Sequence, residues 1–499
     1  MFRKVLIANR GEIAVRIIRT LREMGIATVA VYSEADRTSL HVRMADEAAA
    51  VGPAPSSESY LRIDRILAAA RDRGADAIHP GYGFLSENAD FAAACEDAGV
   101  VFIGPSAGAI RKMGSKTAAR QTAIEGGTPV VPGTDHSVTL EEARAFSAAH
   151  GYPILLKAVA GGGGKGMRLV EHEADLESAF RNAASEAERA FRNPEIYVER
   201  YVSHSRHIEI QLVGDRHGNM IHLGERECSL QRRHQKVVEE CPSPLVTLHP
   251  EMREAMGAAA IKAARAAGYW NAGTVEFLVD ANHRFYFLEM NTRLQVEHPV
   301  TELVTGLDLV RVQVEIAAGL PLTIRQKDIS WRGAAIEARI YAEDPYNDFL
   351  PFPGTLTRLT RPMGPGVRVD GCVYDGWTVP MEYDPLLAKL AVWGATRDQA
   401  IERMIRALRE YDVGGIRTNI GFFRQILEDE ELRAGRLHTG FIDEFFTRHR
   451  PPEPPAALAA VAALAAGLHT VSRGRPADAD STGPRMSAWL KSGRKDLLQ

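Results

Sequence analysis

Three oxygen-bearing side chains occur on a predicted β-hairpin past the middle of the chain. The letters DANH at 280–283 are a turn signal between two strand-like runs. Because side chains alternate along a strand, Glu289 and Asn291 share one face of the second run, and Glu276 on the first run can face the same side. Two carboxylates and an amide make a hard oxygen cluster suited to Mg²⁺ or Mn²⁺ bound to ATP phosphates. A polar pair on a solvated sheet face is the alternative, and the apolar and aromatic neighbours argue against it.

Further chemistry-bearing residues follow this hairpin directly. They are Arg293, Gln295, Glu297 and His298. A cation and a carboxylate packed beside a metal-binding strand are expected where a small anion must be held and deprotonated.

A glycine-rich loop, GGGGKG at 161–166, lies between two predicted strands. Its glycines would let backbone N–H groups approach phosphate oxygens, and a nearby lysine would add positive charge. The loop is not a Walker A motif, because Gly166 stands where Ser or Thr is required and a strand follows in place of a helix. Lys157 lies on the preceding strand, where a charge needs a partner. For the loop taken alone, a flexible hairpin turn is the alternative, and Lys116 taken alone would be a solvated helix residue.

The elements that must position these residues follow two patterns. From residue 4 to 104, buried strands alternate with amphipathic helical segments, which predicts a parallel sheet covered by helices. The loop after the first strand reads NRGE at 9–12 and lacks the spaced glycines of GxGxxG, which argues against dinucleotide binding. Short strands dominate after residue 207. Helices are expected over 106–126, 173–192, 399–411 and 419–427.

Composition sets the general class. A chain of 499 residues suggests two to four domains, and its net charge of -4 gives no general attraction to nucleic acid or to an anionic membrane. We identify no signal peptide and no apolar run approaching the roughly 18 residues of a membrane helix. The four cysteines form no CxxC pair, which argues against a disulfide scaffold or a zinc site and fits a reducing cytoplasm.

Seven segments, taken in chain order, closely resemble the biotin carboxylase subunits and domains of biotin-dependent carboxylases. They are ANRGEIAVRI, HPGYGFLSEN, IGP, GGGGKGM, ERECSLQRRHQKVVEE, EMNTRLQVEHPVTE and ARIYAEDP. The resemblance runs from Phe2 to about Phe446. Its most specific parts are EMNTRLQVEHPVTE and QRRHQKVVEE, whereas the glycine loop alone fits many ATP-grasp ligases.

The resemblance implies a multidomain chain of the α/β and α+β classes with an ATP-grasp fold. Residues 1–113 would form a Rossmann-like N-terminal domain. Residues 114–330 would form the ATP-grasp domain, with a lid at about 131–203 and a core that holds the metal hairpin. Residues 331–446 would form a mixed α/β C-terminal domain, and 447–499 a tail that could dock on a partner.

The resemblance also assigns roles to individual residues. The expected nucleotide contacts are Lys116, Lys157, Glu199, Arg200, Tyr201, Val202, His207, Gln231, His234, Glu276 and Glu289. Gly163 and Gly164 would cover the phosphates when the lid closes. Glu276, Glu289 and Asn291 are the expected metal ligands.

The remaining assignments concern bicarbonate and biotin. Lys236, Arg293 and the backbone of Val296 would hold bicarbonate. Glu297 would be the base that deprotonates it, and Arg339 would stabilise the biotin enolate. Of these residues, Lys236, Arg293 and Glu297 are the predicted catalytic residues.

The expected reaction is ATP- and bicarbonate-dependent carboxylation of biotin through carboxyphosphate, in the presence of Mg²⁺ or Mn²⁺, with two ions expected. It would be the first half-reaction of an acetyl-CoA, propionyl-CoA or other acyl-CoA carboxylase, as in fatty acid biosynthesis, with pyruvate as an alternative acceptor. The chain has no AMKM-like biotinylation site and no segment of carboxyltransferase size. The biotin carboxyl carrier protein and the carboxyltransferase are therefore expected on other chains.

The resemblance further suggests a homodimer formed partly through the first helix, with Arg16 and Glu23 at or near the contact. A solvated helix face is the alternative for these two residues. Two departures stand out: Ser115 occupies a position where the family often has Asp, and the chain continues beyond Arg450 with PPEPP, an Ala-rich stretch and a polar segment. A disordered extension is the alternative to a docking tail.

Two other functions are weighed against this one. Another ATP-grasp carboxylate–amine ligase, as in purine or carbamoyl phosphate synthesis, would share the metal hairpin but lack RLQVEHPVTE beside QRRHQK. A non-catalytic nucleotide-binding regulatory protein predicts the loss of one or more of four residues, all of which are present. These are Lys236, Glu289, Arg293 and Glu297.

Overall fold

The computed structural model describes residues 1–159, 166–233, 235–449 and 456–473, and the chain divides into two units, Met1–Arg448 and His449–Gln499. The second unit contains one described helix, α17 (Ala456–Arg473). Its described apolar side chains are exposed, among them Val461, Leu464 and Leu468. The Ala-rich stretch is therefore helical, as the high helix propensity of Ala and Leu predicts. Among the described residues, no helix is long and apolar enough to cross a bilayer.

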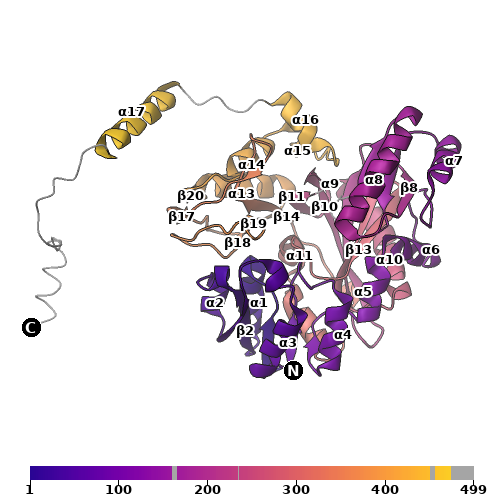
Figure 1. The fold of residues 1–499 in the computed structure, drawn as a ribbon, viewed down its shortest axis with the longest axis horizontal. Helices are drawn as coiled ribbons and strands as arrows, with labels where there is room; N and C mark the ends of the chain where they lie inside the picture. The colour runs from indigo at the N-terminus through magenta and orange to yellow at the C-terminus, as the bar shows by residue number, and fades with distance from the viewer. Residues whose placement is uncertain (160–165, 234, 450–455, 474–499) are drawn as a thin grey trace, which may run out of the picture. The chain divides into compact units, whose positions relative to one another are not determined.

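The first unit begins with a parallel sheet in the strand order β3-β2-β1-β4-β5. Figure 1 draws this part of the chain in indigo, with β2 labelled among the helices α1, α2 and α3. Its elements are β1 (Lys4–Ile7), α1 (Gly11–Glu23), β2 (Ala27–Ser33), α2 (Leu40–Met44), β3 (Glu47–Gly52), α3 (Ile63–Asp72), β4 (Ala77–His79), α4 (Ala89–Asp97) and β5 (Val101–Phe102). The alternating pattern of the sequence is thus confirmed as a parallel sheet. On α1, Ile13, Ile17 and Leu21 recur at helical spacing and are buried against the sheet.

A small antiparallel sheet, β7-β6-β8, forms the region predicted as the lid. Its strands are β6 (Ile154–Ala158), β7 (Met167–Val170) and β8 (Ile196–Arg200), accompanied by α7 (Leu140–His150) and α8 (Leu176–Phe191). The helix expected over 106–126 is in fact two helices, α5 (Ala107–Gly114) and α6 (Lys116–Glu125). The break falls at Ser115, whose side chain accepts a hydrogen bond from the Ala118 N–H and so caps α6.

The largest sheet has eight strands in the order β13-β12-β9-β10-β11-β14-β19-β18. They are β9 (Arg206–Gly214), β10 (Met220–Arg232), β11 (Gln235–Cys241), β12 (Asn271–Val279), β13 (Phe285–Asn291), β14 (Ala334–Tyr341), β18 (Val367–Gly371) and β19 (Leu386–Gly394). Strands β11 and β14 pair antiparallel, with Val238 opposite Ala338. The sheet is therefore continuous across residue 330, where the sequence placed a domain boundary; the division into four domains stays a prediction.

The remaining helices of the first unit are α9 (Pro244–Leu248), α10 (Glu251–Ala266), α11 (His298–Thr305), α12 (Leu309–Ala317), α13 (Arg397–Glu410), α14 (Ile420–Ile426), α15 (Glu430–Arg433) and α16 (Phe441–Arg448). Of these helices, α10, α11, α12, α13 and α16 contact strands of the eight-stranded sheet. Two short strand pairs, β15 (Glu343–Asp344) with β16 (Leu350–Pro351) and β17 (Arg358–Thr360) with β20 (Asp412–Gly414), complete the unit together with single 3₁₀ turns at Glu34–Asp36, Ser56–Glu58, Glu173–Asp175 and Gln326–Asp328. The helices predicted over 399–411 and 419–427 are confirmed as α13 and α14.

Candidate active site

The predicted carboxylate hairpin is formed by β12 and β13. Glu276 lies directly opposite Glu289, and Thr274 lies opposite Asn291. The Asn291 side-chain amide donates to Glu276 Oε1 at 2.8 Å. Burial and then the neighbouring Glu276 raise the pKa of Glu289. A carboxylate whose charge is disfavoured by burial and by a facing carboxylate, together with a hard amide oxygen, fits a divalent cation that would neutralise it.

Lys236 on β11 lies at the centre of a cluster of carboxylates. Its ammonium group donates to Glu209 Oε2 at 2.6 Å, to Glu276 Oε1 at 2.7 Å and to Glu297 Oε1 at 2.8 Å. Burial works against its charge, but these carboxylates raise the pKa of Lys236 well above its usual value. The lysine is therefore a buried cation that joins the carboxylate hairpin to Glu297.

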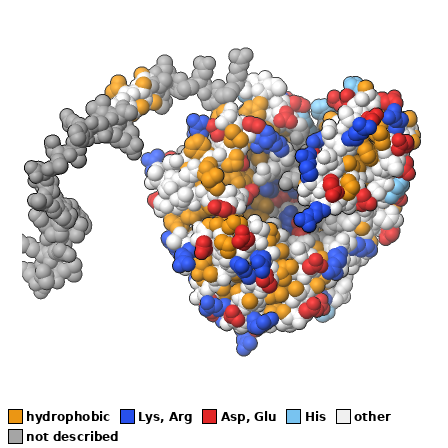
Figure 2. Space-filling model, viewed as in Figure 1, with side chains coloured by type: hydrophobic (Ala, Val, Ile, Leu, Met, Phe, Trp, Pro, Cys, Tyr) orange, Lys and Arg blue, Asp and Glu red, His pale blue; other side chains and the backbone are white. Residues whose placement is uncertain are grey.

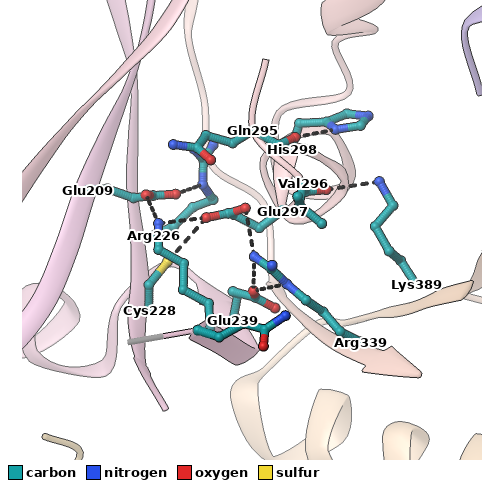
Figure 3. Close-up of polar contacts among 12 residues, drawn as sticks. Glu209, Arg226, Cys228, Glu239, Gln295, Val296, Glu297, His298, Arg339 and Lys389 are labelled. Carbon is teal, nitrogen blue, oxygen red and sulfur yellow. Dashed lines mark hydrogen bonds and ion pairs between the residues drawn. The ribbon is translucent and has the colours of Figure 1, made fainter. Parts of the chain in front are cut away.

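Glu297 precedes α11 and receives cations on both of its oxygens (Figure 3). Lys236 donates to Oε1, and Arg339 on β14 donates to Oε2 at 3.0 Å. Arg339 also donates to Glu239 at 2.6 Å. Burial alone would raise the pKa of Glu297, but Lys236, Arg339 and Arg226 lower it well below the usual value. Glu297 is consequently ionised.

Arg293 is held by two neighbours on its own segment and by Glu87 from the N-terminal part of the chain. Its Nε donates to Glu87 Oε2 at 2.8 Å, and its terminal nitrogens donate to Gln295 Oε1 at 2.9 Å and Asn291 Oδ1 at 3.0 Å. The guanidinium is thereby oriented next to the carboxylate hairpin. The Val296 carbonyl accepts from Lys389 at 2.9 Å (Figure 3), so an anion bound at this residue would use its backbone N–H.

The predicted nucleotide contacts fall into two groups. In the lid, Lys157 donates to Glu199 Oε2 at 2.9 Å, and Lys116 lies 3.4 Å from the Ala158 carbonyl. Burial and then the nearby Lys157 lower the pKa of Lys116 to about 8. Near the hairpin, His207 Nε2 lies 2.8 Å from Glu276 Oε2. The side chain of Gln231 contacts the other ring nitrogen of His207 at 2.8 Å.

The segment predicted as a nucleotide-binding hinge, from Glu199 to Val202, is tied to its surroundings. The Glu199 carboxylate is buried and paired with Lys157 and with Arg120 at 3.1 Å. The backbone N–H groups of Arg200 and Tyr201 donate to Pro132 and Pro153. Nucleotide contacts from this segment would therefore use backbone groups that do not take part in these hydrogen bonds. Gly163, Gly164 and His234 lie outside the described residues.

Several charged residues in this network were not predicted from the sequence. Arg226 on β10 is fully buried and donates to Glu209, Gln211, Thr274 and Thr301. Glu209, Glu87, Arg120 and Lys389 likewise contact predicted site residues. For Glu209 and Lys389 the available signal was a charge between apolar residues of a strand, because a buried charge requires a partner.

A continuous chain of hydrogen bonds and ion pairs connects Arg293 to Arg339 across the site. Contacts run from Arg293 through Asn291, Glu276, Lys236 and Glu297 to Arg339. Figure 2 shows Lys and Arg side chains gathered around a hollow on the face drawn there. Fixed cations beside acidic groups suit anionic substrates and a cation-bound polyphosphate.

Comparisons with protein families match the chain in three successive parts. The biotin carboxylase N-terminal domain matches residues 1–110, the ATP-binding domain of the carbamoyl-phosphate synthase L chain matches 115–325, and the biotin carboxylase C-terminal domain matches 337–444.

Individual proteins give the same result. Biotin carboxylase 1 of Bacillus subtilis (strain 168) is 53% identical over 447 residues, which cover 89% of this chain and 99% of that protein. The propionyl-CoA carboxylase alpha chain of Ruegeria pomeroyi is 49% identical over 500 residues, covering 95% of this chain and 72% of that one.

Solved structures agree with the relatives. A biotin carboxylase–β,γ-ATP complex from Campylobacter jejuni has a TM-score of 0.87 at 46% identity, covering 89% of this chain and 99% of that one. The biotin carboxylase domain dimer of Hydrogenobacter thermophilus 2-oxoglutarate carboxylase, in complex with MgADP, ADP and bicarbonate, has a TM-score of 0.86 at 47% identity, covering 89% and 98%.

The lid sheet, the carboxylate hairpin and the fixed cations define an enzyme of the ATP-grasp class. More narrowly, the chain belongs to the biotin carboxylase family of ATP-dependent ligases.

Proposed function

We propose that this chain carboxylates biotin with ATP and bicarbonate, and that the biotin is attached to a separate carrier protein. The observation that carries the proposal is the carboxylate of Glu297, held between Lys236 and Arg339 next to the carboxylate hairpin. A base, an anion-binding cation and a metal-binding pair in one network are what the activation of bicarbonate by ATP needs.

Divalent cations bound to ATP would neutralise phosphate charge during transfer, and Glu276, Glu289 and Asn291 are the residues that would hold them. Lys116 and Lys157 would bind the nucleotide from the lid side. The lowered pKa of Lys116, about 8, reflects burial and the nearby Lys157. A polyphosphate between these lysines would relieve their mutual repulsion.

Lys236, Arg293 and the Val296 N–H would bind bicarbonate, and Glu297 would remove its proton. The low pKa of Glu297 follows from its ion pairs with Lys236 and Arg339. When Lys236 binds bicarbonate and Arg339 binds biotin, their ion pairs with Glu297 weaken and the pKa of Glu297 would rise. Binding of the substrates would therefore make Glu297 a stronger base.

A bicarbonate oxygen would attack the γ-phosphorus, releasing ADP and forming carboxyphosphate. This intermediate would break down to CO₂ and phosphate beside the ureido ring of biotin. The released phosphate would take the proton from the ureido nitrogen, Arg339 would stabilise the negative charge of the resulting biotin enolate, and CO₂ would then bond to that nitrogen. Closure of the lid would exclude water, which otherwise destroys carboxyphosphate.

The direct test is ATP hydrolysis by the purified chain with Mg²⁺, with and without bicarbonate, followed by ¹⁴C-bicarbonate incorporation into free biotin. Bicarbonate-dependent hydrolysis that biotin stimulates, with acid-labile ¹⁴C on biotin, is expected. Hydrolysis that requires an amine acceptor in place of biotin would support another ATP-grasp ligase and overturn the proposal. A chain that binds ATP without turnover under all these conditions would be a regulatory protein.

The partners follow from the same chemistry. A biotin carboxyl carrier protein and a carboxyltransferase on other chains would complete the reaction, as part of an acetyl-CoA, propionyl-CoA or other acyl-CoA carboxylase. Pyruvate is an alternative final acceptor, since one of the relatives is a pyruvate carboxylase subunit of Methanothermobacter thermautotrophicus, 53% identical over 446 residues. We place the reaction in the cytoplasm, and fatty acid biosynthesis is the expected setting for an acetyl-CoA enzyme.

We also infer a homodimer that uses the exposed end of α1. Arg16 is buried and paired with Glu302 at 2.8 Å and Asp308 at 2.9 Å within the chain, so it would support the contact rather than form it. Glu23 is exposed and lines a hollow of about 400 Å³ beside these residues. Sedimentation should give a dimer at micromolar concentration, and Glu23→Arg should shift it toward monomer. A monomeric wild-type chain with full activity would contradict the inference.

A further inference from the structure

A second cluster of metal-ligand type lies outside the candidate active site. The ligand atoms of His204, His438 and Glu444 all lie within 4.8 Å of one another. His438 Nε2 is 3.4 Å from Glu444 Oε2, and His204 Nδ1 is 3.8 Å from Glu444 Oε1. The two other groups of this kind in the described parts of the chain both contain Glu209 and belong to the site above.

Two separate segments bring these residues together. His204 lies in the short connection between β8 and β9, in a left-handed conformation with φ 47° that non-glycine residues seldom adopt. His438 precedes α16, and Glu444 lies on that helix. The Thr439 N–H donates to the Ser205 carbonyl at 2.9 Å, which fixes the two segments side by side. The cluster therefore rests on backbone contacts rather than on side chains alone.

The ligand set selects a class of cation. Two imidazoles and one carboxylate suit Zn²⁺ and similar borderline divalent ions, whereas Mg²⁺ and Ca²⁺ prefer oxygen ligands. The side chain of His438 is 17% exposed, that of Glu444 45% and that of His204 70%. A cation bound here would keep one side open to water, as three-ligand zinc sites do.

The two oxygens of Glu444 face different neighbours: Oε2 lies 3.4 Å from His438 Nε2, and Oε1 lies 3.8 Å from His204 Nδ1. Arg448 lies 3.7 Å from Glu444 Oε2 and competes for that oxygen, which leaves Oε1 directed toward His204.

We propose that His204, His438 and Glu444 form a binding site for Zn²⁺ or a cation of the same class. Because His204 follows the last strand of the lid sheet and the other two ligands lie at α16, the cation would tie the base of the lid to the C-terminal part of the first unit. This site is independent of the function proposed above, since it shares no residue with the active-site network.

The test is a zinc titration of the full chain at pH 7.5, measured by competition with a chromophoric chelator in the absence of ATP. The wild-type chain should bind one Zn²⁺. The variants His204→Ala and His438→Ala should each bind Zn²⁺ about tenfold more weakly than wild type, or not at all. Glu444→Gln, which keeps an oxygen but loses the charge, should give an intermediate affinity. Zinc should also raise the Tm of wild type and leave that of His438→Ala unchanged.

The matched control is His249→Ala, because His249 and His283 form another close imidazole pair, with ring centroids 4.3 Å apart, next to an exposed Glu251. This variant should bind zinc as wild type does. If His438→Ala loses its fold, His204→Ala still tests the site, since that side chain is mostly exposed. Zinc binding of equal stoichiometry and affinity in wild type, His204→Ala and His438→Ala would overturn the proposal, as would a wild-type chain that binds none.

Discussion

Glu289 faces Glu276 across the hairpin, and this pairing leads to a prediction that separates catalysis from folding. Glu289→Gln should lower ATP turnover by about 10²-fold or more, because an amide cannot replace a carboxylate that binds phosphate-bound metal. The free energy of unfolding should not fall, since burial and Glu276 already raise the pKa of Glu289 and disfavour its charge. ATPase kinetics and urea unfolding measure the two effects.

The control for this variant is Glu188→Gln, at an exposed position on α8. It should leave both turnover and stability unchanged. Near-normal ATPase activity of Glu289→Gln at ordinary Mg²⁺ concentration would show that the hairpin is structural.

Arg293 makes its contacts through three nitrogens of its guanidinium group. We expect both the planar shape of this group and its charge to contribute to catalysis. Arg293→Ala should lower kcat for biotin carboxylation by about 10²–10³-fold with the KM for ATP changed only a few-fold, because this side chain faces the hairpin and Glu87 rather than the lid. Arg293→Lys keeps the charge but cannot contact Glu87, Gln295 and Asn291 together, so it should recover only part of the loss. A collapse of ATP affinity with carboxylation intact would contradict the assignment.

At the level of single residues, the candidate-site residues that lie in recognisable motifs were predicted from the sequence. The charged residues that contact them only through tertiary packing were not. Glu276, Glu289 and Asn291 follow from strand periodicity, and the structure places them together. Glu209 lies between two isoleucines on β9 and Arg226 lies between two glutamates on β10, and their mutual ion pair depends on the pairing of β9 with β10. The register of two strands is not visible in either strand alone.

The same contrast holds for the elements. Helices α8, α13 and α14 show apolar periodicity and were predicted near their observed bounds. The break at Ser115 was missed, although Ser at a helix start is a recognised capping signal. The continuity of the large sheet was also missed, because β11 and β14 are separated by a long stretch of sequence and pair only through tertiary structure.

The N-terminal sheet and its helices should lose stability in mild acid. Burial lowers the pKa of His41 to about 4, with Arg10 acting in the same direction and Asp36 opposing, and burial lowers that of His79 to about 3. The unfolded chain takes up these protons near pH 6.5 and the folded chain does not, so stability is present above pH 6.5 and is lost as the pH falls toward 4. At pH 5 each histidine should cost up to about 2 kcal/mol.

Urea unfolding of wild type and His41→Gln at pH 7 and pH 5 measures this contribution. The loss of stability between the two pH values should be smaller in the variant, whatever the variant's stability at pH 7. The exposed His150→Gln should lose as much as wild type. An equal loss in all three proteins would show that His41 does not contribute.

Within the first unit, ion pairs connect parts that are distant in sequence. Two of them are buried: Glu12 on α1 lies 3.3 Å from Lys389 on β19, and Arg16 binds Glu302. A third, between Glu87 and Arg293, is partly exposed. A partner removed from a buried pair leaves a buried charge, which typically costs about 3–5 kcal/mol. The candidate site is thus supported by residues from every part of the unit, and this is why local patterns identified its residues without predicting how they are held.

The second unit gives the last prediction. Helix α17 exposes Val461, Leu464 and Leu468, and an isolated helix of Ala and Leu has little stability of its own in water. The segment around Trp489, Leu490 and Lys491 lies outside the described residues, but it places an aromatic side chain beside basic ones, as partner-docking segments often do. We propose that this unit tethers the chain to the carrier or the transferase and takes no part in the chemistry.

Truncation after Arg448 tests the tether directly. It should leave carboxylation of free biotin within a few-fold of wild type, because the network from Arg293 to Arg339 lies wholly in the first unit. The same truncation should weaken co-purification with the partner chains, and substitution of Leu464 and Leu468 by Ser should weaken it as well if the helix forms the contact. Loss of free-biotin carboxylation, or assembly equal to that of the full chain, would rule out the tether.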